Sequence, residues 1–129
     1  MRDLLNRALE ARENAYAPYS DYRVGAALLT EDGRIFVGSN MENASYGATL
    51  CAERSAFASA ISSGVRKFKA IAIAGGKEKA EESVHPCGIC RQVMAEFCSE
   101  DFKIIYGNEE TLKECTLAQL LPLSFRLED

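Results

Sequence analysis

The sequence predicts an α/β protein with three α/β/α layers built around a mixed, mostly parallel sheet of about five strands. Short apolar runs alternate with stretches of helical spacing along most of the chain. An Asp32-Gly33 turn between two of these runs adds an antiparallel hairpin ahead of the alternating part. The 129 residues are 47% hydrophobic, so we expect residues 1–129 to form a single domain with a substantial core.

Four apolar runs bounded by turn residues are expected to be strands, and a shorter fifth strand should follow them. The five segments are residues 24–30, 35–37, 68–74, 102–106 and 111–114. The first two should pair across the Asp32-Gly33 turn, and Gly107-Asn108 should end the fourth.

Four stretches are expected to be helices, namely residues 4–16, 51–63, 88–98 and 116–121. Pro18, Gly64 and Pro122 stand where the first, second and last of them should stop, and Thr116 is a candidate N-cap. Because the second and third helices each follow a strand and a loop, right-handed crossovers can bring their first turns together at one end of the sheet.

Charge and hydropathy exclude several kinds of partner. The net charge is −4, and the densest basic stretch is the short segment 66–69, so we expect no nucleic acid partner. No apolar run approaches the roughly 18 residues of a membrane span, and the first residues are charged. We therefore expect a cytoplasmic protein without membrane contact that acts on a small uncharged molecule.

Cys51, Cys87 and Cys90 form the sharpest signal in the chain. Cys51 begins the sequence Cys-Ala-Glu, and the other two stand in Pro-Cys-Gly-Ile-Cys. The second motif alone could be a redox pair, half of a structural zinc site or chance. Three thiolates together leave the fourth position of zinc for water, which is typical of a catalytic site. All three cysteines fall at predicted helix starts, where the helix dipole favours a thiolate, so we expect one Zn²⁺ per chain.

Glu53 and Arg54 follow Cys51 closely enough to serve the same site. A carboxylate that is not a metal ligand can take a proton from the activated water and deliver it to the substrate, which is the role expected for Glu53. Arg54 returns to the helix face of Cys51 and should donate hydrogen bonds to the thiolates, offsetting their surplus negative charge. The alternative is that both side chains are ordinary surface charges.

The other cysteines and the single histidine are not expected to complete the site. Cys98 lies about two helical turns beyond Cys90, and Cys115 is remote, so both should be small buried apolar residues. His85 could be a fourth ligand or could hydrogen-bond one, although the stiff Pro86 argues against direct ligation.

Several segments in the same order resemble the cytidine deaminases of the small homotetrameric, zinc-dependent class. The matching segments are Tyr16-Ala17-Pro18-Tyr19-Ser20, Val24-Gly25-Ala26-Ala27-Leu28, Asn40-Met41-Glu42-Asn43-Ala44, Cys51-Ala52-Glu53-Arg54, Pro86-Cys87-Gly88-Ile89-Cys90-Arg91-Gln92, and Leu120-Leu121-Pro122 with Phe125. The resemblance implies a deaminase fold and hydrolysis of cytidine, and of deoxycytidine, to uridine or deoxyuridine plus ammonia in pyrimidine salvage.

The same resemblance implies roles in holding a nucleoside. Asn40 and Glu42 match residues that hydrogen-bond the ribose, which suits their amide and carboxylate groups. The backbone amide of Ala52 and the carboxylate of Glu53 would orient the pyrimidine. Tyr22 stands where the family usually has Phe and should stack against the base.

Tyr46 and Phe125 match residues that reach into the active site of a neighbouring subunit. The resemblance thus implies a homotetramer with shared active sites.

Three other functions remain to be weighed. A nucleic-acid deaminase would use the same zinc chemistry, but the acidic charge balance and the pair Asn40 and Glu42 argue against it. A deaminase of a nucleoside-like antibiotic, such as the blasticidin deaminases, shares most of the motifs. A zinc module without activity, or a thiol redox protein using only Cys87 and Cys90, leaves Glu53 without a role.

Overall fold

The computed structural model describes residues 1–127, and its five strands form one sheet in the order β2-β1-β3-β4-β5. The strands are β1 (Arg23–Thr30), β2 (Ile35–Ser39), β3 (Phe68–Gly76), β4 (Lys103–Gly107) and β5 (Leu112–Thr116). The helices are α1 (Arg2–Arg12), α2 (Ala52–Ser62), α3 (Gly88–Phe97) and α4 (Leu117–Leu120), with a 3₁₀ turn η1 (Tyr46–Ala48). Within the described residues, no helix has the length and apolar character needed to cross a bilayer.

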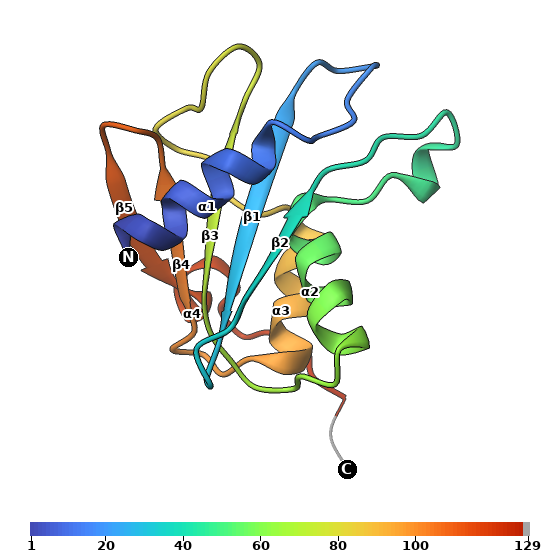
Figure 1. Ribbon diagram of the computed structural model, residues 1–129. Helices are drawn as coiled ribbons and strands as arrows, with labels where there is room; N and C mark the ends of the chain where they lie inside the picture. The colour runs from blue at the N-terminus through green and yellow to red at the C-terminus, as the bar shows by residue number, and fades with distance from the viewer. Residues whose placement is uncertain (128–129) are drawn as a thin grey trace.

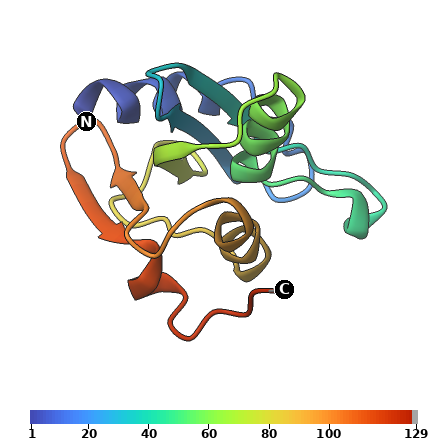
Figure 2. The same ribbon diagram turned by 90° about the horizontal axis from the view of Figure 1, so that it is seen from below.

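Helices cover both faces of the sheet, as the three-layer prediction requires. Figure 1 shows α1 lying over one face, across β1 and β3, while α2 and α3 pack behind the other face. The view from below in Figure 2 shows the sheet between α1 and the pair of α2 and α3. Alternate side chains of the central strands β1, β3 and β4 therefore point into two separate cores.

The two cores differ in size and in the side chains that fill them. Under α1, Leu5 and Ala8 pack on small strand residues such as Ala72. Beneath α2 and α3, the larger core is built around Phe57 and Ile71. The rigid attachment of α2 and α3 to this larger core fixes the position of their first turns.

The prediction of a mostly parallel sheet was wrong, although the sheet is mixed and has five strands. Only β3 and β4 pair in parallel; β1 pairs antiparallel with both β2 and β3, and β4 pairs antiparallel with β5. The reason is that β1 lies between β2 and β3. The crossover through α2 therefore joins two strands that run in the same direction but are not neighbours.

The first helix is shorter than predicted and ends at Arg12, whereas helical spacing had extended it to Tyr16. The Tyr16 N–H donates to the Asn40 carbonyl (2.9 Å), and the Tyr16 carbonyl accepts from the Glu42 N–H (2.8 Å). Backbone pairing with the segment after β2 thus replaces the last helical turn. The other α-helices and all five strands lie within two residues of their predicted bounds, whereas the short turn η1 was not predicted.

Arg12 is buried at the end of α1, with 4% of its surface exposed. Its guanidinium donates to the carbonyls of Arg23 (3.1 Å) and Gly76 (2.8 Å), so the buried charge is solvated by backbone oxygens. These bonds tie the end of α1 to the start of β1 and the end of β3.

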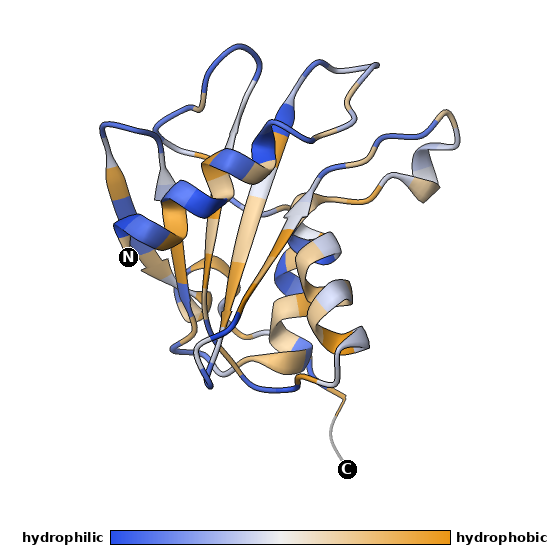
Figure 3. Ribbon diagram, in the orientation of Figure 1, coloured by the Kyte–Doolittle hydropathy of each residue, from blue (hydrophilic) through white to orange (hydrophobic). Residues whose placement is uncertain are grey.

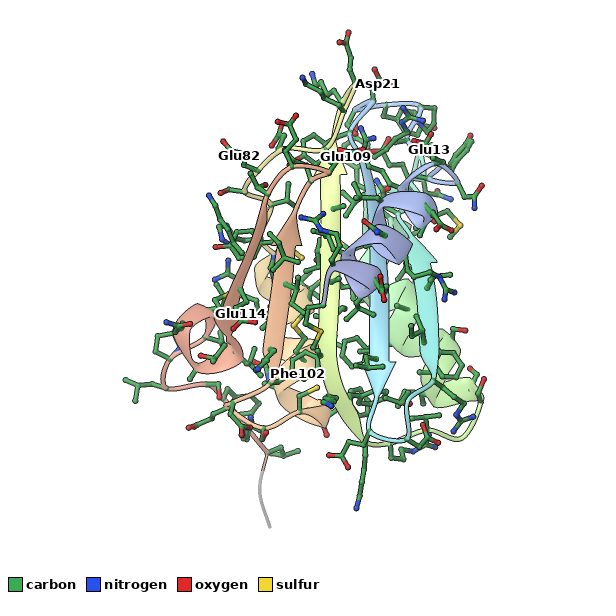
Figure 4. The ribbon with its side chains drawn as sticks, turned by 60° about the vertical axis from the view of Figure 1, so that its left-hand side comes forward. Glu13, Asp21, Glu82, Phe102, Glu109 and Glu114 are labelled. Atoms are coloured by element: carbon green, nitrogen blue, oxygen red, sulfur yellow. The ribbon has the colours of Figure 1, made fainter. Side chains whose placement is uncertain are left out.

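The loops that follow α1 and β3 rise at the same end of the sheet, at the top of Figure 1, and the loop after β2 projects beside them. Figure 3 shows that these loops are largely hydrophilic, in contrast to the apolar strands. In Figure 4, Asp21, Glu82 and Glu109 gather at this end, while Phe102 lies towards the other. Helices α2 and α3 both begin on the side of the loops, which is where the candidate site lies.

Candidate active site

Three cysteine sulfurs meet where α2 and α3 begin. The Sγ atoms of Cys51 and Cys87 are 3.8 Å apart, and those of Cys87 and Cys90 are 3.4 Å apart. All three sulfurs lie within 4.8 Å of one another. The structure thus brings together the three cysteines singled out in the sequence, although Cys51 and Cys87 come from different helices.

The helix starts explain why these sulfurs face one another. Cys51 is the N-cap of α2, and Cys87 is the N-cap of α3, where its sulfur accepts from the Cys90 N–H (3.4 Å). The buried Pro86 precedes this cap, and its carbonyl accepts a hydrogen bond from Nε of Arg91 (2.7 Å). These hydrogen bonds hold the segment that carries two of the cysteines.

This donor set fits zinc. Four ligands at a zinc–sulfur distance of about 2.3 Å in a tetrahedron lie about 3.8 Å apart, close to the two sulfur separations given above. Within residues 1–127, no His, Asp or Glu joins the three sulfurs. Three protein ligands are the number that a catalytic zinc site uses, because the fourth position takes water or substrate.

The Cys51 sulfur is held in a setting that favours the thiolate. Hydrogen bonding from Cys90, and then from Arg54, lowers the pKa of Cys51 to about 5. Nη2 of Arg54 lies 3.4 Å from Cys51 Sγ and also donates to the Thr49 carbonyl (3.3 Å). Arg54 therefore lies on the face of α2 that carries Cys51, where its positive charge can offset the negative charge of the thiolates.

Glu53 lies in the first turn of α2 and is 5% exposed. Burial, with a smaller contribution from the charge of Cys51, raises the pKa of Glu53 to about 7. A carboxyl group with a pKa near neutrality can both accept and donate a proton at that pH. The side chain lines the same pocket as Cys51 and Cys87.

The pocket beside the cysteines has a volume of about 330 Å³, within the usual range for small-molecule sites. Its walls come from Tyr22 and Val24 around the start of β1, from Asn40, from residues 49–53, and from residues 83–85 with Cys87. None of these lining residues is Lys or Arg. The pocket therefore suits a small polar molecule without a large negative charge.

A family model described as "Cytidine and deoxycytidylate deaminase zinc-binding region" matches residues 1–107, a span that includes all three cysteines and Glu53. The chain belongs to this deaminase family. Since the matched region is the zinc-binding region of the family, the group of Cys51, Cys87 and Cys90 is a site for one zinc ion per chain.

Individual deaminases are similar to this chain over nearly its whole length. The cytidine deaminase of Halalkalibacterium halodurans is 50% identical over 127 residues, which cover 98% of this chain and 94% of that protein. The crystal structure of cytidine deaminase from Burkholderia pseudomallei has a TM-score of 0.88 at 44% identity, covering 96% of this chain and 98% of that one. The blasticidin-S deaminase of Bacillus cereus is 30% identical over 122 residues, covering 89% and 86% respectively.

Three of the expected substrate contacts of this deaminase line the pocket, namely Tyr22, Asn40 and Ala52. The Asn40 side chain already has two backbone partners: Oδ1 accepts from the Val24 N–H (2.8 Å), and Nδ2 donates to the Tyr22 carbonyl (2.9 Å). An amide can make two further bonds. The ribose contact of Asn40 stays a prediction.

Glu42, Tyr46 and Phe125 are not among the residues that line the pocket. The Glu42 carboxylate accepts from the N–H groups of Tyr19 (2.9 Å) and Ser20 (3.2 Å), and a further hydrogen bond from the Ser20 hydroxyl holds its pKa below the usual value. Tyr46 is 82% exposed and Phe125 68% exposed. A single deaminase chain thus does not bring these three residues to its own pocket.

His85 lines the pocket, but it does not belong to the sulfur group. Its ring centroid lies 4.6 Å from that of Tyr106, so its apolar face is packed on the sheet. Cys98 is buried in the larger core, as expected, whereas Cys115 is only partly buried and packs against that core.

Sequence reasoning missed Val24 at the start of β1 and, ahead of the ligand cysteines, four further pocket residues of the deaminase: Thr49, Leu50, Ser83 and Val84. Each of these four stands one to four residues ahead of a ligand cysteine in the chain. Their proximity in the sequence was the available signal, because residues directly before a metal ligand lie close to the metal site. Their residue types alone carry no such indication.

Proposed function

We propose that this protein hydrolyses cytidine, and deoxycytidine, to uridine or deoxyuridine and ammonia. The observation that carries the proposal is the buried Glu53 beside the three cysteine sulfurs in a pocket that has no cationic lining. The similarity to the cytidine deaminases of Halalkalibacterium halodurans and Burkholderia pseudomallei supports the choice of substrate.

Glu53 handles the protons of this reaction. Cys51, Cys87 and Cys90 would hold the zinc ion, which when bound would supply the Lewis acid that makes a water molecule a stronger nucleophile. Glu53 takes a proton from the water and gives it to the ring nitrogen next to the amino-bearing carbon, which makes that carbon more electrophilic. As the water oxygen bonds to the carbon, Glu53 carries the second water proton to the amino group, and the carbon–nitrogen bond breaks to release ammonia. Cytidine and water thus become uridine and ammonia.

The proposal is tested by following the loss of cytosine absorbance when the purified protein meets cytidine, with bound zinc measured in the same sample. We expect uridine to form at about one zinc per chain, and a chelator to stop the reaction. Blasticidin S serves as the comparison substrate because one relative acts on that antibiotic by name. Zinc at full occupancy without turnover of cytidine would refute the proposed substrate.

We infer further that four chains assemble and share their active sites. The exposed Tyr46 and Phe125 support this, since large apolar and aromatic surfaces are favoured at protein interfaces. Leu50, Phe57, Ile61, Val93 and Phe97 also line an open apolar groove between α2 and α3. In this proposal, residues 1–129 form one cytoplasmic domain that reaches its full site only in the assembly.

Light scattering measures the assembly directly. We expect a mass of four times 14.2 kDa. If neighbouring subunits complete the site, Phe125→Ala should weaken nucleoside binding even though Phe125 lies outside the pocket of its own chain. A fully active monomer would contradict this inference.

A further inference from the structure

Tyr22 and Glu81 join two walls of the pocket. The Tyr22 hydroxyl donates to Oε1 of Glu81 over 3.0 Å. Tyr22 lines the pocket just before β1, and Glu81 lies in the loop between β3 and α3. The same loop contributes Ser83 and His85 to the pocket wall. The hydrogen bond therefore links the aromatic wall to the wall formed by the loop.

The loop is held at both ends by arginine side chains. At its start, the guanidinium of Arg12 donates to the carbonyl of Gly76 (2.8 Å). At its end, Nε of Arg91 donates to the carbonyl of Pro86 (2.7 Å). The middle of the loop must be positioned by other contacts.

In the middle of the loop, the Glu81 N–H donates to the Gly75 carbonyl (2.8 Å). The hydrogen bond between the Glu81 side chain and Tyr22 reaches a residue that lines the pocket. Within residues 1–127, it is the only side-chain hydrogen bond between residues 78–85 and the chain ahead of β3. Packing supports it: a Cβ atom placed on Gly75 would lie 3.3 Å from the Tyr22 ring and 3.3 Å from Val84. Gly75 thus lets the ring and the loop close over the end of β3.

Tyr22 also connects this loop to the residues expected to bind the sugar. Its N–H donates to the Ser20 hydroxyl oxygen (3.0 Å), and that hydroxyl donates to Glu42. Its carbonyl accepts from Nδ2 of Asn40 (2.9 Å). Tyr22 therefore links Asn40, which lines the pocket, and Glu42, which does not, to Glu81 in the loop.

We propose that Glu81 is a positioning residue for nucleoside binding, acting through the Tyr22 hydroxyl to hold residues 78–85 closed against the pocket. This inference rests on the proposed deaminase function. Glu53 is held by α2 and not by the loop. Loss of the bond should therefore weaken binding of the nucleoside and leave the chemical step nearly intact.

The test compares Tyr22→Phe, which removes only the hydroxyl, with Glu81→Ala. Each variant should raise KM for cytidine about fivefold, the effect of one ordinary net hydrogen bond, because the bond to Glu81 is exposed to solvent, while kcat stays within about twofold. The double variant should be no worse than either single variant, because both remove the same interaction. Glu81→Gln keeps an acceptor oxygen and should fall between Glu81→Ala and the unchanged protein.

Glu82→Ala is the matched control, because Glu82 is the neighbouring exposed carboxylate and lies at the same end of the molecule (Figure 4). It should leave KM unchanged. Amide hydrogen exchange of residues 78–85 gives a readout that needs no turnover, and exchange there should be faster in Tyr22→Phe than in the unchanged protein.

The positioning role is overturned by an unchanged KM in Tyr22→Phe, by additive effects in the double variant, or by an equal fall in kcat. Failure of the proposed function looks different, because the unchanged protein itself would then not convert cytidine. Even in that case, hydrogen exchange decides whether the hydroxyl holds the loop: equal exchange in both proteins refutes it.

Discussion

Replacing Glu53 by Gln should lower kcat for cytidine at least a thousandfold while zinc stays bound, since positioned proton transfer contributes roughly 10² to 10⁴ and Glu53 serves two transfers. The substitution keeps the size of the side chain and its place in the first turn of α2. It removes only the ability to take up and release a proton. Single-turnover kinetics with cytidine measures the fall in rate, and metal analysis measures the zinc that stays bound.

Glu96→Gln is the control for this experiment, because it makes the same change at an exposed position of α3. Its kcat should equal that of the unchanged protein. Near-normal turnover in Glu53→Gln would mean that another group moves the protons. Loss of zinc in that variant would instead give Glu53 a part in holding the metal site together.

Replacing Cys87 by Ala should remove the metal and, with it, the activity. Groups that only hydrogen-bond a metal ligand typically contribute 10- to 100-fold to metal affinity, so loss of a ligand should cost more than about 100-fold. Cys87 lies within 3.8 Å of the Cys51 sulfur and within 3.4 Å of the Cys90 sulfur, and a methyl group cannot replace its lone pairs. Zinc per chain after dialysis against a weak chelator is the quantity to measure.

Cys115→Ala serves as the comparison, since Cys115 packs against the core and does not belong to the sulfur group. This variant should keep its zinc and its activity. Full metal content in Cys87→Ala would show that the metal is held elsewhere and would refute the ligand assignment.

The local elements were predictable because each carries its own signal. Asp32-Gly33 marks the hairpin turn, and Thr116 does cap α4, forming a reciprocal pair of hydrogen bonds with Gln119. The order of the strands could not be predicted in the same way. Hydrophobic periodicity indicates which face of a strand is buried, but it does not indicate which strand lies beside it. The placement of β1 between β2 and β3, and the end of α1 at Arg12, are settled by contacts between distant segments.

The same distinction applies to the site. The cysteines and Glu53 stand at helix starts in short motifs, so spacing and resemblance could assign them together. The contact between Tyr22 and Glu81 spans 59 residues and depends on the path of a charged loop, which has no periodic pattern. The tyrosine hydroxyl was visible in the sequence only as a departure from the usual Phe, and its partner could not be found without coordinates.

The two segments that carry the cysteines have a consequence for folding as well as for chemistry. Cys51 and Cys87 lie 36 residues apart, and the intervening chain includes all of α2 and all of β3. An ion can bind both residues only when that long loop is closed, so the entropy of loop closure is already lost in the folded chain before the ion binds. Metal affinity and conformational stability are then thermodynamically linked, because an ion that binds only the folded chain shifts the folding equilibrium by mass action.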